Sequence, residues 1–295
     1  MRALADFVMR GRMQATITVA GAALVPLLMW LSAAAGSLVL LRRGLNDALG
    51  VLTWAVLPGL LWWYLGDPSV LLVLLGTLTL AQVLRASVSW RRVLLASVAV
   101  GVVFALVLGS VFADAIQALV DEFQKLLPQV LGPAYSQLSA DEQAQLQQLL
   151  RPVLTGLMAA FFQTVCLLCL VLGRYWQAQL YNPGGFGREF RALHLSPALG
   201  LGLFLAMLLA PNLGLQLGML TPICSVPLAL AGVALLHGLV AIKGAARFWL
   251  VGFYVVLLVF GQLVYPLLVL FAVVDSLFDF RGRLVRRQGS TNGEG

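Results

Sequence analysis

The few ionisable side chains inside or beside long apolar runs are the first candidates for chemistry. His237 lies near the end of one such run. Asp275 directly follows another, and Asp279 and Arg281 lie one and two turns beyond it. Helical spacing favours Arg283 with Asp279 over Arg281 with Asp275. The simpler interpretation is a boundary histidine and a solvated helix end, and the alternative is a contact between His237 and Asp275.

Uncharged polar side chains within the apolar runs are a second group, since they could line a binding pocket. Such side chains usually join helices to one another by hydrogen bonds. Prolines interrupt the runs near Pro211 and Pro222, and broken helices often expose backbone groups to a substrate. The side chains predicted to line a polar ligand cavity are Asn212, Gln216, Thr221 and Gln163.

A glycine-rich loop, residues 181–191, is the third candidate. Its glycines could present backbone amides to a phosphate, but it lacks the Gly-Lys-Ser/Thr ending and a preceding strand. We therefore interpret it as a tight turn flanked by arginines.

The sequence has no pattern typical of catalysis or of a metal centre. It contains no Ser/His/Asp nucleophilic set, no metal-ligand motif and no Walker motif. Cys166 and Cys169 share a helix face, but with only two histidines in the chain no ligand cluster joins them, so they are interpreted as packing residues. We expect a protein that is not an enzyme, binds no metal and uses no cofactor.

Long apolar segments must position all of these side chains. Of 295 residues, 61% are hydrophobic and 11% charged, against about 45–50% and about 25% in soluble domains. About 20 continuously apolar residues cross the hydrocarbon as one helix, and the absence of alternation argues against a barrel. We predict an all-α polytopic transmembrane bundle with apolar segments at 15–41, 48–66, 69–84, 93–113, 152–173, 197–210, 215–242 and 248–274.

The first and last segments, each 27 residues long, pose a choice of topology. Each contains a proline, Pro26 or Pro266, and is either one tilted helix or a hairpin of two short helices. Short cytoplasmic loops carry the excess Lys and Arg. With hairpins, only Lys125 and Arg151 of the 19 basic residues fall outside. Charge therefore favours hairpins, about ten helical passes and cytoplasmic termini.

Residues 114–151 are predicted to form a helical hairpin outside the membrane. Apolar residues recur at helical spacing from 114 to 127, and the pattern from Ser139 to Glu142 is a capping box that opens a second helix through Leu150. Residues 1–280 are taken as one transmembrane domain containing this insertion, and 281–295 as a basic, disordered cytoplasmic tail. The start of the chain resembles a signal peptide, but its apolar run continues to Leu41, which favours a retained anchor.

Three stretches together resemble the YybS-like family of bacterial multi-pass membrane proteins. The stretches are Tyr181-Asn182-Pro183-Gly184-Gly185-Phe186 with Glu189-Phe190-Arg191, then Leu236-His237-Gly238-Leu239, then Val274-Asp275-Ser276-Leu277-Phe278-Asp279-Phe280-Arg281. The family is grouped with the substrate-binding S components of energy-coupling-factor vitamin transporters. The resemblance implies a helical domain that binds a small molecule while other subunits supply energy. S components are typically shorter, six-helix chains. They also often carry an early Ala-x-x-x-Ala pattern, whereas here Ala15 is followed by Val19 and Ala20 by Leu24 at that spacing.

The resemblance defines no role for the motif residues, which are Asn182, Pro183, Gly184, Gly185, Glu189, His237, Gly238, Asp275, Asp279 and Arg281.

We predict a multi-pass protein of the bacterial inner membrane that binds or helps to transport a small molecule. The alternative is a scaffold or assembly partner that meets a membrane protein through the outer hairpin, and an intramembrane enzyme ranks third. The net charge of +7 does not indicate nucleic acid, because the basic residues cluster beside apolar runs.

Overall fold

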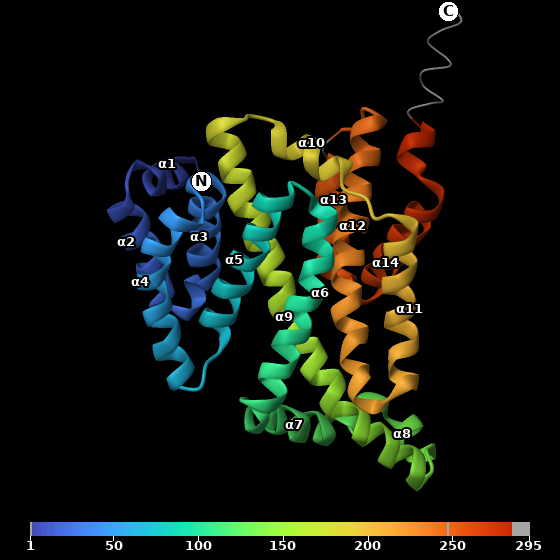
Figure 1. Ribbon diagram of the computed structural model, residues 1–295. Helices are drawn as coiled ribbons and strands as arrows, with labels where there is room; N and C mark the ends of the chain where they lie inside the picture. The colour runs from blue at the N-terminus through green and yellow to red at the C-terminus, as the bar shows by residue number, and fades with distance from the viewer. Residues whose placement is uncertain (1, 247, 285–295) are drawn as a thin grey trace, which may run out of the picture.

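The computed structural model describes residues 2–246 and 248–284, and within them every regular element is a helix (Figure 1). Six helical segments are long and apolar enough to cross a membrane, which confirms the all-α membrane bundle. In chain order the elements are α1 (Arg2–Arg10), α2 (Arg12–Ala23), the 3-10 turn η1 (Pro26–Leu28), α3 (Met29–Arg43), α4 (Leu45–Tyr64), α5 (Ser69–Ser87), α6 (Trp90–Ser110), α7 (Ala113–Leu131), α8 (Pro133–Gln137), α9 (Ala140–Tyr181), α10 (Gly185–Ala192), α11 (Pro197–Leu213), η2 (Leu215–Met219), α12 (Leu220–Ile242), α13 (Phe248–Val259) and α14 (Gly261–Phe278).

Both long end segments are broken, so the predicted hairpins are confirmed. Between α2 and α3 the backbone of Val25 is extended, the conformation that a following proline favours. The second break lies at Phe260, between α13 and α14. Pro266 lies inside α14 and does not mark the turn. Transmembrane helices tolerate an internal proline where neighbouring groups satisfy the freed backbone.

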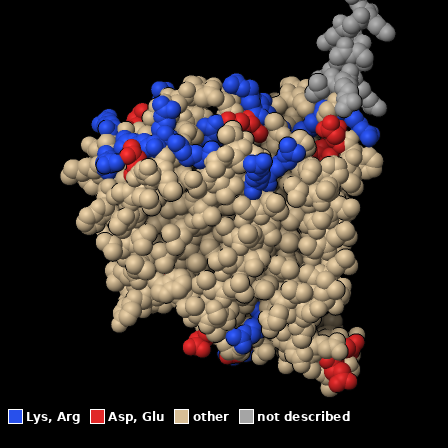
Figure 2. Space-filling view, in the orientation of Figure 1, with Lys and Arg blue, Asp and Glu red and all other residues tan. Residues whose placement is uncertain are grey.

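The two ends of the bundle carry side chains of opposite charge. Lys and Arg side chains gather over the end that carries α1 and α10, while the end formed by α7 and α8 shows mainly acidic side chains (Figures 1 and 2). We call these the basic end and the acidic end. The N-terminal helix and the last described residues both lie at the basic end.

The segment at the acidic end differs in one respect from the predicted hairpin. The amphipathic helix is present as α7, and the capping box is present too: Ser139 Oγ accepts from the Glu142 amide at 3.3 Å, and Glu142 Oε2 accepts from the Ser139 amide at 2.8 Å. The second helix, however, does not end near Leu150. It continues through Pro152 as the 42-residue α9 and becomes the central span of the bundle.

Glycines set the closest helix contacts. A Cβ on Gly173 of α9 would overlap Ser37 Oγ of α3, and a Cβ on Gly232 of α12 would overlap the Leu268 carbonyl of α14. Lipid gives no hydrophobic drive for helices to associate, so close backbone approach and van der Waals contact hold them together. These two contacts fix α9 against α3, and α12 against α14.

Replacing either glycine with alanine should destabilise the bundle. We expect Gly173→Ala and Gly232→Ala to lower the free energy of unfolding by about 1–3 kcal/mol, the usual effect of overpacking. The measurement is the thermal unfolding midpoint in detergent. Gly202→Ala in α11 is the control, because a Cβ there meets nothing within 4 Å. Equal midpoints for all three variants would contradict the packing described here.

Candidate functional site

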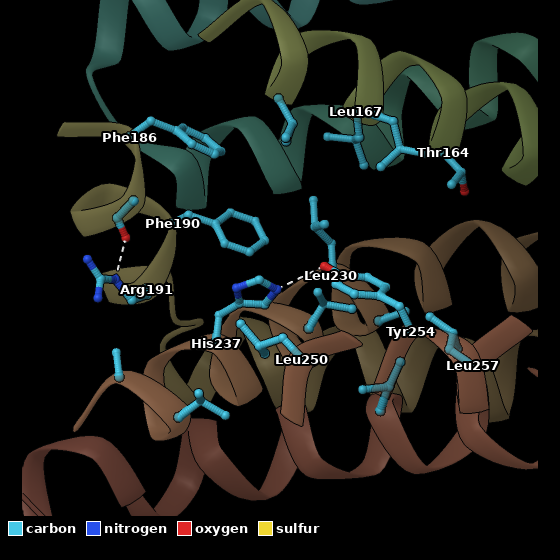
Figure 3. A pocket seen from close by; sticks show the side chains of 18 of the residues that line it. Thr164, Leu167, Phe186, Phe190, Arg191, Leu230, His237, Leu250, Tyr254 and Leu257 are labelled. Carbon is cyan, nitrogen blue, oxygen red and sulfur yellow. Dashed lines mark hydrogen bonds between the residues drawn. The ribbon is translucent and has the colours of Figure 1, made fainter. Parts of the chain in front are cut away.

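A cavity of about 820 Å³ lies among α9, α10, α12, α13 and α14 (Figure 3). Its volume falls within the roughly 300–1,000 Å³ of small-molecule pockets. Most of its wall is aliphatic or aromatic. The residues that matter below are Phe186, Phe190 and Arg191 of α10, Leu230, Val233 and His237 of α12, Leu250, Tyr254 and Leu257 of α13, and Tyr265 of α14. We call this space the apolar cavity.

Two hydrogen bonds join helices across the walls of the apolar cavity. His237 Nε2 lies 2.8 Å from the Tyr254 hydroxyl, which links α12 to α13. Tyr265 places its hydroxyl 2.7 Å from Ser225 Oγ, which links α14 to α12. The His237 ring also packs edge-on against Phe190, with centroids 5.4 Å apart. The cavity is therefore apolar with a few polar groups at fixed points, as ligand sites commonly are.

Helix α13 is the most loosely held wall. None of its twelve residues is buried, and it meets the cavity through Leu250, Tyr254 and Leu257, which share one helix face. Regions with few buried apolar contacts open at the lowest free energy. Among the helices that wall the cavity, α13 alone has no buried residue.

Arg281 joins three segments that are distant in the sequence. Its Nη2 donates to Asp275 Oδ2 at 2.7 Å. Its Nη1 donates to the carbonyl oxygens of Arg191 and Leu193, at 2.8 and 2.7 Å. A Cβ on Gly238 of α12 would lie 2.9 Å from Arg281 Cδ, so glycine leaves room for this side chain. The three stretches that carry the family resemblance therefore meet at the basic end, beside the apolar cavity.

The solvated helix end expected at Asp275 is wrong, because Asp275 is buried and pairs with Arg281. Helical spacing favours Arg283 with Asp279, but α14 ends at Phe278 and Asp279 takes a left-handed conformation, φ +44°, which turns the chain back and brings Arg281 to Asp275. The amide of Phe280 then donates to Asp275 Oδ1 at 3.2 Å. His237 does not contact Asp275, since its ring faces Tyr254 and Phe190.

The glycine-rich loop is a tight turn only at residues 182–184, because Gly185–Ala192 form helix α10. Asn182 ends α9, Pro183 is exposed, and Gly184 has a φ of +80°, a conformation that other residues rarely adopt. The side chain of Asn182 lies where a Cβ on Gly185 would sit. Glu189 accepts hydrogen bonds from Arg174, one of them from Nε at 3.0 Å, which ties α10 to α9.

The four uncharged polar residues do not come together, and none lines the apolar cavity. Asn212 and Gln216 are exposed near the acidic end. Thr221 donates to the Met207 carbonyl at 2.7 Å, and buried Gln163 donates to Ser97 Oγ at 3.1 Å. Thr221 and Gln163 thus join helices.

Sequence reasoning missed the aromatic residues of the cavity. Tyr254 stands in the middle of an uncharged run, and Phe186 and Phe190 lie one turn apart in the loop segment. That four-residue spacing, with Arg191 next to Phe190, could have indicated a short amphipathic helix at the membrane surface.

Comparison with known proteins adds no assignment: no family model, no curated protein and no solved structure matches the chain. Membership of the YybS-like family therefore stays a prediction. In the described part of the chain, no group of three or more His, Cys, Asp or Glu side chains is placed to hold a metal ion. The site must be interpreted from its own geometry.

Removing the carboxylate of Asp275 should destabilise the basic end strongly. Asp275 and Arg281 are both buried, and deleting one partner of a buried pair leaves an uncompensated charge at a cost of about 3–5 kcal/mol. We expect Asp275→Ala to lower the thermal midpoint in detergent accordingly. Glu122→Ala is the control, because its pair with Lys125 is exposed and contributes about 0–1 kcal/mol. If both variants lose the same stability, the Asp275–Arg281 pair does not have the structural role assigned to it.

Proposed function

We propose that this integral membrane protein binds a lipid-like small molecule in the apolar cavity, as a binding or transport-related protein with no catalysis of its own. The observation that supports the proposal is a cavity of about 820 Å³ beside the candidate membrane spans α9, α12 and α14, lined mainly by apolar side chains and bounded by the loosely held α13.

The size and chemistry of the cavity favour an apolar occupant. About 820 Å³ of space lies between the helices, and most of the wall around it is apolar. Water fills a cavity only where polar groups hold it, and the walls here offer few. A hydrocarbon chain is the occupant that suits them best.

Access from the bilayer fits this ligand class. A lipid-like molecule is already dissolved in the membrane, and α13 separates the cavity from the surroundings with no buried residue of its own. We also propose that the protein lies in a bacterial cytoplasmic membrane with the basic end, and both termini, in the cytoplasm. The clustering of Lys and Arg at that end supports this orientation (Figure 2).

Filling the cavity should abolish binding. Val233 lines the cavity on α12, so a tryptophan at this position would occupy the space of a chain. We expect dodecanol added to the purified wild-type protein to give a bound species in native mass spectrometry, and Val233→Trp to lose most of it. The control is Leu205→Trp on α11, where the side chain is exposed and lines no part of the cavity.

Two results would overturn the proposal. One is a wild-type protein that retains no small molecule, either after purification in a mild detergent or after addition of dodecanol. The other is equal binding by Val233→Trp, Leu205→Trp and wild type. Either result would favour the alternative, a membrane scaffold that acts through its surface.

A further inference from the structure

A second, basic cavity adjoins the apolar one at the basic end. Its volume is about 400 Å³, and its polar lining comes from Arg188, Arg191, His194, Asp279 and Arg281. We call it the basic recess. Arg191 and Ala241 line both the recess and the apolar cavity, so the two spaces are neighbours.

We propose that the basic recess binds the anionic, phosphate-type headgroup of an amphiphile whose hydrocarbon chain occupies the apolar cavity. This inference rests on the proposed function, because it assumes that the apolar cavity holds a chain. It adds the ligand class: a molecule with one long apolar part and one phosphate or phosphate-like group at its end.

The charged side chains of the recess differ in whether they have partners within the protein. Arg281 is committed to Asp275 and to two backbone carbonyl oxygens. Asp279 accepts from the Gly282 amide at 3.1 Å. By contrast, neither Arg188 nor Arg191 forms an ion pair with any carboxylate in the described residues. The positive charge on α10 is therefore available to a ligand.

The geometry of α10 presents these two guanidinium groups together. Arg188 and Arg191 are three residues apart, which places them on one face of the helix. Arg191 Nε donates to the Gly187 carbonyl at 2.8 Å, and this bond holds the guanidinium along α10 (Figure 3). A guanidinium offers paired donors that match phosphate oxygens, and charge-assisted bonds of this kind are among the strongest in proteins.

The position of Phe190 connects the two halves of the site. Its ring lies in the apolar cavity against His237, while the next residue, Arg191, lies at the border with the recess. A chain that passes Phe190 would bring its headgroup to the two arginines. Basic pockets between transmembrane helices near the cytoplasmic surface are known to hold anionic lipid headgroups. Cytoplasmic charge bias alone accounts for arginines at this end, but not for a pair that lines a recess beside an apolar cavity.

The test uses three probes with the full-length protein in a nonionic detergent: dodecyl phosphate, dodecanol and inorganic phosphate. Native mass spectrometry of competition mixtures gives the binding preference of each variant. We expect wild type to prefer dodecyl phosphate over dodecanol by about tenfold or more, the factor given by one charge-assisted hydrogen bond. The double variant Arg188→Gln/Arg191→Gln should lose this preference and still bind dodecanol.

The control is Arg2→Gln/Arg10→Gln on α1, which also removes two positive charges from the basic end. This variant should keep the preference for dodecyl phosphate over dodecanol. Equal binding of dodecyl phosphate and dodecanol by wild type would overturn the inference and leave the proposed function standing. A preference that survives Arg188→Gln/Arg191→Gln would overturn it too, as would inorganic phosphate that binds as tightly as dodecyl phosphate. Failure of every alkyl probe would remove the proposed function as well.

Discussion

The architecture of the site depends on the ion pair and hydrogen bonds that the guanidinium of Arg281 forms. This group is buried at the basic end, where an unpaired charge would be strongly unfavourable. Asp275 balances its charge from within α14, while the Arg191 and Leu193 carbonyls satisfy its second amino group from the end of α10. One side chain thus fixes the position of α10 against α14, and α10 carries the aromatic rings and arginines of the site.

Helix packing explains why a cavity exists beside this junction. Gly232 lets α12 approach α14 at Leu268, and Gly200 lets α11 approach α14 at Ser276. Helix α14 is therefore drawn toward α11 and α12. Helix α13 has no such close contact and meets the bundle through the His237–Tyr254 hydrogen bond and a line of larger side chains. The apolar cavity is the space left between a tightly packed group of helices and one that stays outside it.

The sequence predicted the parts of this fold that follow from solvation and local chemistry. Arginine clusters identified the hairpins at both ends, and Ser139 with Glu142 identified the start of a helix. Local rules could not show that α9 continues through Pro152, or that the last hairpin turns at Phe260, because tertiary packing decides both. The polar residues Gln163 and Thr221 were expected in a pocket but join helices instead. The cavity depends on where α13 lies relative to α9 and α12, and no local pattern encodes that distance.

A structure determined by electron cryomicroscopy in lipid nanodiscs would show whether the space bounded by α9, α12 and α13 holds a chain-like molecule. We expect elongated density beside Val233 and Leu257 that ends near Arg191, with α13 held away from α9. Helix α13 packed directly against α9, with side chains filling the space, would contradict this expectation.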